Sequence, residues 1–201
     1  LQNLGDIITL GGVGEFSAID LPKVLAGKKA SVYPSIYTYS EGMSGSCSPK
    51  DLETMLQLTY LYFTAPRADQ EVFESTMERT KAMLKNMELN PNLTLSDSIT
   101  KVLYNNHPLR LRMNVEDYDK VDYAKAMEMY KDRFADPNNF VFTFVGNIDV
   151  ETFKPLVEQY LGSLKKNKRK ENWSDVGLGI TEGNYTTHYR KEMQDPKTSV
   201  Y

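Results

Sequence analysis

The strongest constraint on the fold is a helix signal that begins near Ser48 and ends before Pro66. Serine favours the position that caps a helix, Pro49 suits the first helical turn, and a proline such as Pro66 cannot continue a helix. Two apolar stripes follow helical spacing along this segment: Leu52, Met55, Leu56, Tyr60 and Phe63 form one, and Leu58, Leu61 and Tyr62 form the other. A helix that is apolar on two sides is buried on two sides. The sequence therefore predicts a central core helix.

The segments around this helix predict a mixture of strands and helices. Residues Ala30 to Ser48 alternate between β-formers and polar residues, with Glu41-Gly42 as the turn of an antiparallel hairpin. The run NNFVFTFVGNID (138–149) predicts a further strand, as does NYTTHYRKE (184–192). Helices are expected at 69–87, 95–106, 122–134 and 149–162. This order favours an α+β fold, a mostly antiparallel sheet with helices packed on one face.

A glycine cluster near the start, Gly12-Val13-Gly14-Glu15-Phe16-Ser17, partly matches the dinucleotide fingerprint G-x-G-x-x-G. That fingerprint needs a buried strand before it and a long helix after it. The preceding LGDIITL is a poor strand, and the following helix contains Pro22 and ends at Gly27. We therefore interpret the glycines as a turn that enters a short helix capped by Ser17 or Asp20.

The residues alone do not favour a catalytic metal site. The chain has two histidines, His107 and His188, and neither has a second histidine three to five positions away. The motifs H-E-x-x-H and H-x-x-E-H are therefore missing, although a catalytic zinc generally needs three protein ligands at one site. We interpret His107, next to Pro108, as a turn residue and His188 as an exposed strand residue.

Nucleophilic catalysis is an alternative that rests on Ser44 and Cys47. The stretch Gly42-Met43-Ser44-Gly45-Ser46 fails the G-x-S-x-G pattern because its second glycine comes one position early. Cys47 precedes a helix start, whose amides would lower the pKa of a thiol slightly. A free cysteine is more often a small buried hydrophobic residue. The residues alone therefore favour a globular α+β domain without a self-contained catalytic site.

Charge excludes other classes of function. The formal net charge of −3 argues against general nucleic-acid binding. The basic run at Lys165, Lys166, Lys168, Arg169 and Lys170 reads as a soluble linker, and the acidic residues Glu116, Asp117, Asp119 and Asp122 as solvated groups near a helix start. No apolar run reaches the length of a membrane span. The chain starts at Leu1, and we interpret it as a piece of a longer polypeptide, so targeting signals would lie outside it.

Four stretches taken together resemble the insulinase/pitrilysin family of zinc peptidases, in particular its bacterial zinc-protease branch. They are GGVGEFSAIDLPKVLAGKKASVYPSI (11–36), EGMSGSCSPKDLETMLQLTYLYFTAPRAD (41–69), RFADPNNFVFTFVGNIDVETFKPLVEQYLGSL (133–164) and DPKTSV (195–200). The resemblance runs through nearly the whole chain in order, which makes it more specific than any single motif.

This resemblance implies a metallopeptidase-type α/β roll from the C-terminal half of such an enzyme. In the family, the first roll domain carries H-x-x-E-H and holds the zinc, and two halves close around a peptide. The corresponding helix here would end near LQNLGDIITL, which contains no histidine, so no catalytic or metal-binding residue can be assigned. The resemblance implies no cofactor in this chain, zinc in the catalytic domain of the full-length protein, and a bacterial periplasmic or envelope location.

The expected function is that of a non-catalytic wall of the substrate chamber. Its partners would be the catalytic N-terminal half, the adjacent roll domain and the peptide substrate. Candidate lining residues are Gly12, Gly14, Ser31, Tyr33 and Ser35, since extended peptides often pair with an exposed strand. The expected organisation is a non-catalytic roll domain at 1–164, whose N-terminal strand and helix are truncated, a linker at 165–182 and the start of the first strand of the next domain at 183–201.

Two other interpretations stay open at this point. The first is a scaffold or core-subunit-like protein whose whole family has lost peptidase activity. The second is a self-standing enzyme that uses Cys47 or Ser44.

Overall fold

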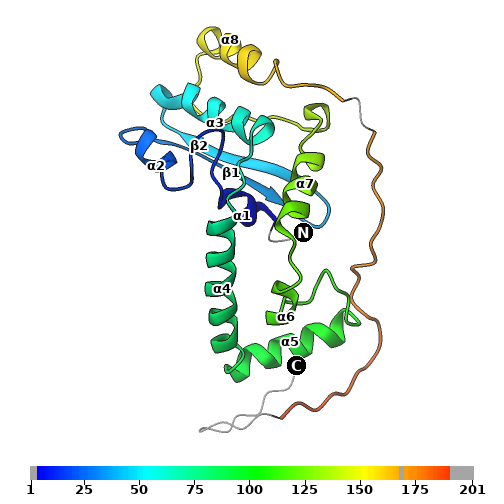
Figure 1. The fold of residues 1–201 in the computed structure, drawn as a ribbon. Helices are drawn as coiled ribbons and strands as arrows, with labels where there is room; N and C mark the ends of the chain where they lie inside the picture. The colour runs from blue at the N-terminus through cyan, green and yellow to red at the C-terminus, as the bar shows by residue number, and fades with distance from the viewer. Residues whose placement is uncertain (1–3, 168–169, 191–201) are drawn as a thin grey trace. The chain divides into compact units, whose positions relative to one another are not determined.

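A computed structural model describes residues 4–167 and 170–190 of the 201-residue chain (Figure 1). The chain divides into two compact units, Leu1–Ser75 with Asp122–Trp173, and Thr76–Val121 with Ser174–Tyr201. Helix α4 (Gln70–Met87) passes from the first unit into the second. Each unit is described by itself below.

The first unit is built on an antiparallel hairpin and the helices that cover one of its faces. Strand β1 (Ala30–Ile36) pairs with β2 (Glu41–Cys47), with Tyr33 opposite Ser44. The helices of this unit are α1 (Leu4–Thr9), α2 (Leu21–Val24), α3 (Leu52–Thr64), α7 (Tyr123–Arg133) and α8 (Val150–Tyr160), with short 3-10 turns η1 (Pro49–Asp51) and η2 (Pro137–Asn139). The fold is α+β, as the sequence predicts.

Helix α3 is the centre of this unit, which confirms the two-sided apolar pattern of its sequence. Its side chains Met55, Leu58 and Tyr62 pack with Val13 and Val32 in one buried cluster. The side chain of Tyr130 on α7 is fully buried, and its hydroxyl donates a 3.0 Å hydrogen bond to the carbonyl of Tyr62. Helix α3 therefore joins the N-terminal hairpin region to α7, whose Tyr130 follows Tyr62 by 68 positions in the sequence.

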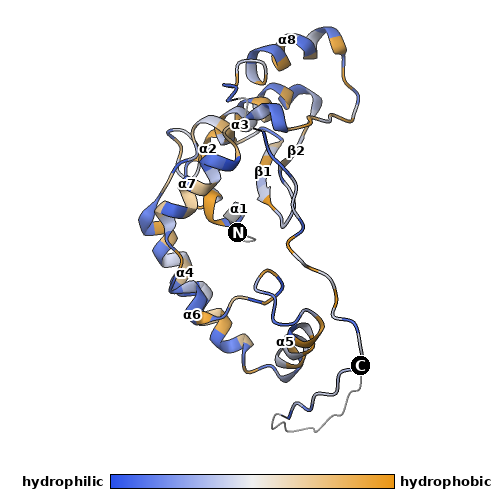
Figure 2. Cartoon of the chain, turned by 90° about the vertical axis from the view of Figure 1, so that its right-hand side faces the viewer, coloured by the Kyte–Doolittle hydropathy of each residue, from blue (hydrophilic) through white to orange (hydrophobic). Residues whose placement is uncertain are grey.

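The second unit contains the rest of α4, α5 (Pro91–Leu103), α6 (Val115–Tyr118) and an extended segment that begins at Ser174. Helix α4 carries both hydrophilic and hydrophobic residues along its length (Figure 2), and its Met77 and Leu84 are buried. The extended segment is tied to the end of α5, because the amide of Thr181 donates to the carbonyl of Leu103 at 2.8 Å. Arg112 and Asp97 form an ion pair in the same unit.

Two predicted strands are absent from the described residues. Residues 140–145 are extended, but their backbone pairs with no other strand within the part of the chain that the structure describes. The alternation of side chains seen in the sequence is real, yet a strand also needs a neighbouring strand to complete its hydrogen bonds. Residues 184–190 likewise form no strand, and 191–192 lie outside the described residues. The domain boundary expected at 183 stays a prediction.

The helix expected at 95–106 begins earlier than predicted, at Pro91. Asn90 caps it, since its side chain accepts a hydrogen bond from the amide of Asn92. The helices expected at 69–87 and 122–134 are confirmed as α4 and α7, and the helix predicted to start at Asp149 is confirmed as α8. Ser17 caps the first turn, because its hydroxyl accepts a hydrogen bond from the amide of Asp20 at 3.1 Å and donates to the Asp20 carboxylate at 2.7 Å. Asp20 itself makes no side-chain cap bond, and α2 lasts a single turn.

Candidate functional site

The candidate residues Ser31, Tyr33 and Ser35 lie in one row on β1. Because side chains alternate along a strand, these three point away from Val32 and Ile36, which are buried. Tyr33 is 63% exposed. The residues opposite them in the register are Ser46, Ser44 and Gly42. We call this surface the outer hairpin face; it is polar, flat and made mostly of small residues.

Hydrogen bonds hold the serines of the outer hairpin face in place. The hydroxyls of Ser31 and Ser46 lie 3.2 Å apart across the two strands, and Ser35 donates to the carbonyl of Gly42 at 3.4 Å. Backbone pairing between β1 and β2 fixes the spacing of the row, so the face is rigid before any ligand arrives.

Gly12 and Gly14 do not join this row. Both have left-handed backbone angles, φ 89° and 56°, and the amide of Gly14 donates to Ala65 at the end of α3 at 2.8 Å. A side-chain carbon added to Gly12 would lie 2.2 Å from the carbonyl oxygen of Phe16. The glycines are therefore needed for a tight turn that packs on α3. This agrees with the turn interpretation and gives them a structural role.

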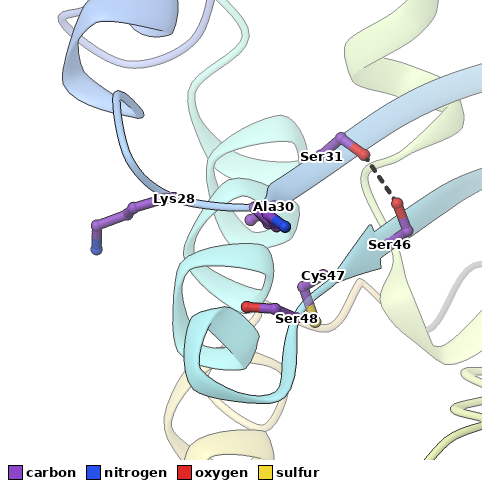
Figure 3. A pocket seen from close by; sticks show the side chains of 7 residues that line it. Lys28, Ala30, Ser31, Ser46, Cys47 and Ser48 are labelled. Carbon is purple, nitrogen blue, oxygen red and sulfur yellow. Dashed lines mark hydrogen bonds between the residues drawn. The ribbon is translucent and has the colours of Figure 1, made fainter.

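A shallow hollow of about 470 Å³ lies at the open end of the hairpin, between the start of β1 and the end of β2 (Figure 3). It is lined by Lys28, Lys29, Ala30, Ser31, Ser46, Cys47 and Ser48. Figure 3 shows the side chain of Lys28 pointing away from the strands. Its ammonium group donates to Thr54 at 2.9 Å.

The chemistry of this hollow does not favour a cysteine nucleophile. Partial burial raises the pKa of the Cys47 thiol, and the negative charge of Asp51 adds to this effect. The expected lowering by helix amides is therefore wrong: desolvation and the nearby carboxylate disfavour the thiolate. Both histidines of the sequence belong to the second unit, so the unit that holds Ser44 and Cys47 contains no imidazole base.

The described residues do not fit a zinc ion. No three histidine, cysteine, aspartate or glutamate side chains come together among them in a way that could hold a metal. His107 instead belongs to a loop, where its Nδ1 accepts from the amide of Leu109 at 3.3 Å and its Nε2 lies 2.8 Å from the carbonyl of Val176. No catalytic step through a metal can be built from these side chains.

The sequence reasoning missed an exposed aromatic group at the tip of the hairpin. Tyr39 and Trp173 lie with their ring centroids 6.4 Å apart, and Trp173 is 75% exposed. The segment before Trp173 is anchored by Arg133, which binds Glu41 at 2.7 Å and Glu171 at 3.3 Å. Tyr39 and Trp173 lie more than a hundred positions apart in the sequence, so no local pattern could have paired them.

Comparison with known proteins identifies the kind of domain to which these features belong. Residues 120–201 match the family model described as the Peptidase M16 inactive domain. The chain is 32% identical over 117 residues to the zinc protease PQQL-like of Arabidopsis thaliana, covering 58% of this chain and 12% of that protein. It is 22% identical over 154 residues to the probable zinc protease PqqL of Haemophilus influenzae, covering 77% of this chain and 16% of that protein.

Residues 120–201 are therefore similar to a non-catalytic domain of the M16 peptidase family. The chain spans only 12% and 16% of the two curated relatives. No helix among the described residues is both long and apolar enough to cross a membrane.

Solved structures show the same fold at low sequence identity. The periplasmic protease PqqL from Escherichia coli superimposes with a TM-score of 0.71 and 19% identity, covering 90% of this chain and 20% of that one. The ferredoxin protease FusC, solved in complex with Arabidopsis ferredoxin, gives a TM-score of 0.67 and 14% identity over 90% of this chain and 19% of that one. A structure of the first half of E. coli PqqL gives 0.57 and 15%, over 85% and 38%. These similarities concern the M16 fold alone.

Proposed function

We propose that this M16 domain forms part of the substrate chamber of a longer zinc-dependent endopeptidase. The zinc site and the hydrolytic chemistry would lie in another domain of the same polypeptide, its catalytic N-terminal half. The match to an inactive domain and the two zinc-protease relatives support this assignment. A periplasmic location is proposed from the E. coli relative, whose structure is that of a periplasmic protease.

The outer hairpin face is the observation that carries the proposal. It is the polar side of a sheet whose other side is covered by α3, and its side chains are short apart from Tyr33. A flat face of small hydroxyls accommodates many peptide sequences, while one exposed tyrosine supplies apolar contact and a hydroxyl at a low entropic cost. The peptide would therefore contact the face of the sheet at Ser31, Tyr33 and Ser35.

Peptide addition along the outer edge of β1 is less favourable than contact with the face. The amide of Tyr37 donates to Ser40 and the amide of Ser48 donates to Lys29, and hydrogen-bonded pairs alternate with non-hydrogen-bonded pairs along an antiparallel hairpin. Pro34 therefore falls in a non-hydrogen-bonded pair, and its backbone points away from β2. Proline has no amide hydrogen, and the outer edge of β1 therefore lacks a donor at its centre. Gly5 of α1 also lies against the carbonyl of Pro34.

The test is the substitution Tyr33→Ala in the full-length polypeptide, with peptide hydrolysis as the readout. If Tyr33 contacts bound peptide, KM rises about 5- to 10-fold while kcat stays unchanged, since an interface side chain of this kind contributes roughly 1 kcal/mol to binding. Tyr185→Ala is the matched control, because Tyr185 is 57% exposed and lies outside the proposed face. An unchanged KM in Tyr33→Ala, or an equal change in both variants, contradicts the proposal.

A further inference from the structure

The tip of the hairpin carries a second stretch of the chain, residues 170–173, which we call the KENW segment. The ring of Trp173 lies 6.4 Å from that of Tyr39, which belongs to the turn between β1 and β2. The carboxylate of Glu171 lies 3.3 Å from the guanidinium of Arg133, the last residue of α7. Both contacts lie within the first unit, and we call Tyr39 and Arg133 together the hairpin-tip site.

Arg133 gives the hairpin-tip site a charged group that the fold already holds in place. Its Nη2 donates to both carboxylate oxygens of Glu41, at 2.8 and 2.7 Å, and the side chain of Glu41 is only 10% exposed. The other terminal nitrogen, Nη1, faces Glu171. A planar guanidinium can bind two carboxylates because its donors point in fixed, different directions. One carboxylate is therefore part of the fold, and the KENW segment supplies the second.

The KENW segment has the pattern of a short peptide ligand, in which an aromatic residue follows an acidic one by two positions. Side chains two positions apart point to the same side of an extended chain, about 7 Å from each other. Here the carboxylate contacts Arg133 and the indole contacts Tyr39. Tyrosine, tryptophan and arginine are the residues that dominate binding energy at protein interfaces. The contact therefore has the composition of a recognition site.

The contacts of the KENW segment are weak enough to exchange. Trp173 is 75% exposed, so its contact with Tyr39 removes little apolar surface from water. The side chains of Arg133 and Glu171 are 34% and 29% exposed, and water and salt screen an ion pair in such a position. Holding a stretch of chain in one place also costs conformational entropy. The segment therefore occupies the hairpin-tip site without being locked into it.

The hairpin-tip site continues the outer hairpin face. Tyr37, the residue after β1, is 65% exposed and follows the row that contains Tyr33 and Ser35. Tyr39 comes two positions later in the turn and is 49% exposed. A peptide that lies along the outer hairpin face toward the turn therefore arrives at Tyr39, the residue that Trp173 contacts.

We propose that the hairpin-tip site binds extended peptides in which an aromatic residue follows an acidic one by two positions, and that the KENW segment occupies it as an internal competitor. This deepens the proposed function, on which it rests, by naming the class of peptide taken at this end of the outer hairpin face. A peptide of that class displaces Glu171 from Arg133 and Trp173 from Tyr39. Peptides without the acidic and aromatic pair leave the segment in place.

Binding of a labelled peptide to the chain and to its Trp173→Ala variant tests the inference. The probe is KENFS, the sequence of residues 170–174 with phenylalanine in place of tryptophan. Trp173→Ala should bind KENFS about 10-fold more tightly than the unsubstituted chain, because a tethered competitor lowers the fraction of open sites. The control peptide KQNAS, which lacks the acidic and aromatic side chains, should bind neither protein. Equal affinity of the two proteins for KENFS, no binding to either, or equal binding of the two peptides overturns the inference.

Two substitutions of Tyr39 in the Trp173→Ala background separate the role of the ring from that of the fold. Tyr39→Phe keeps an aromatic ring and should bind KENFS within about 2-fold of its parent. Tyr39→Ala removes the ring and should bind about 10-fold more weakly, the loss expected for a central aromatic contact. Equal affinity of the two variants contradicts a role for Tyr39 in the site.

The single tryptophan of the chain gives an independent readout, because its fluorescence anisotropy reports on the KENW segment alone. Saturating KENFS should lower the anisotropy of Trp173, since a displaced segment moves more freely, and KQNAS should leave it unchanged. A constant anisotropy at saturating KENFS would mean that the peptide binds elsewhere, which overturns the inference. Neither readout uses hydrolysis, so failure here leaves the proposed chamber role and its Tyr33 test standing. Failure of the Tyr33 test leaves the binding of KENFS to be measured in the same way.

Discussion

Asp51 joins the open end of the hairpin to the start of helix α3. Its carboxylate accepts hydrogen bonds from the hydroxyl of Ser48 and, at 2.9 Å, from the amide of Lys29. These bonds hold the pKa of the Asp51 carboxyl below its ordinary value of 3.8, with the Ser48 hydroxyl as the main cause. Asp51 follows Ser48 by three positions in the sequence, whereas its bond with the amide of Lys29 is a tertiary contact.

The lowered pKa of Asp51 predicts a specific dependence of stability on pH. A carboxyl whose pKa is lower in the folded state stabilises the fold above its unfolded pKa, and loses this contribution as the pH falls through the folded pKa. Asp51→Asn should therefore reduce the free energy of unfolding at pH 7, and the gap to the unsubstituted chain should narrow below about pH 3.8. Urea unfolding of both proteins between pH 7 and pH 3 measures this difference in the free energy of unfolding. A difference that stays constant over this range would show that the charge of Asp51 does not stabilise the fold.

At the scale of elements, ring packing fixes the segment 140–145 and α7 onto α3. Phe134, 2% exposed, stacks on Tyr130 at 4.5 Å and on Phe140 at 5.3 Å, and meets the edge of Phe63 at 5.6 Å. The sequence predicted α3, α4, α7 and the hairpin because each has a local period or cap. It predicted a strand in the run 138–149 because the alternation of side chains is local, whereas the hydrogen-bonding partner of a strand is not.

Phe134→Ala tests this packing. Removing a buried ring leaves a cavity among the surrounding aromatics, so the free energy of unfolding should fall by roughly 3–5 kcal/mol. Tyr160→Phe is the control: it removes only a hydroxyl that bonds Glu53 at 2.8 Å on the exposed side of α3. Denaturant midpoints compare the two variants. A loss of less than about 1 kcal/mol in Phe134→Ala would show that these rings do not hold the segment on α3.

At the scale of the whole molecule, the chain has the M16 fold without a metal-binding group among its described residues. The fold also resembles the first half of E. coli PqqL, at a TM-score of 0.57, and a shared fold does not by itself assign a catalytic role. The helix that precedes the glycine turn, α1, contains Asp6 as its one ionisable residue.

The chain by itself should hold no stoichiometric zinc and cleave no peptide. Zinc needs three protein ligands at one site, and the M16 motif H-x-x-E-H is missing from the sequence. Metal analysis after dialysis against a moderate chelator, together with a fluorogenic peptide assay, measures both properties. The full-length polypeptide is the positive control; an inactive and zinc-free full-length protein would favour the scaffold alternative. One tightly bound zinc per isolated chain would contradict the prediction.

The sequence by itself determined the fold class, the hairpin, most of the helices and the resemblance to the M16 family, because caps, periods and ordered motifs are local signals. It also named Ser31, Tyr33 and Ser35 as candidate lining residues of a predicted strand, and the alternation along β1 puts them on one face. Tertiary structure alone decided that Gly12 and Gly14 pack on α3, that Cys47 has a raised pKa, and that Tyr39 meets Trp173. It also left 140–145 unpaired within the described residues. These outcomes depend on desolvation and on contacts between distant segments, which no local pattern encodes.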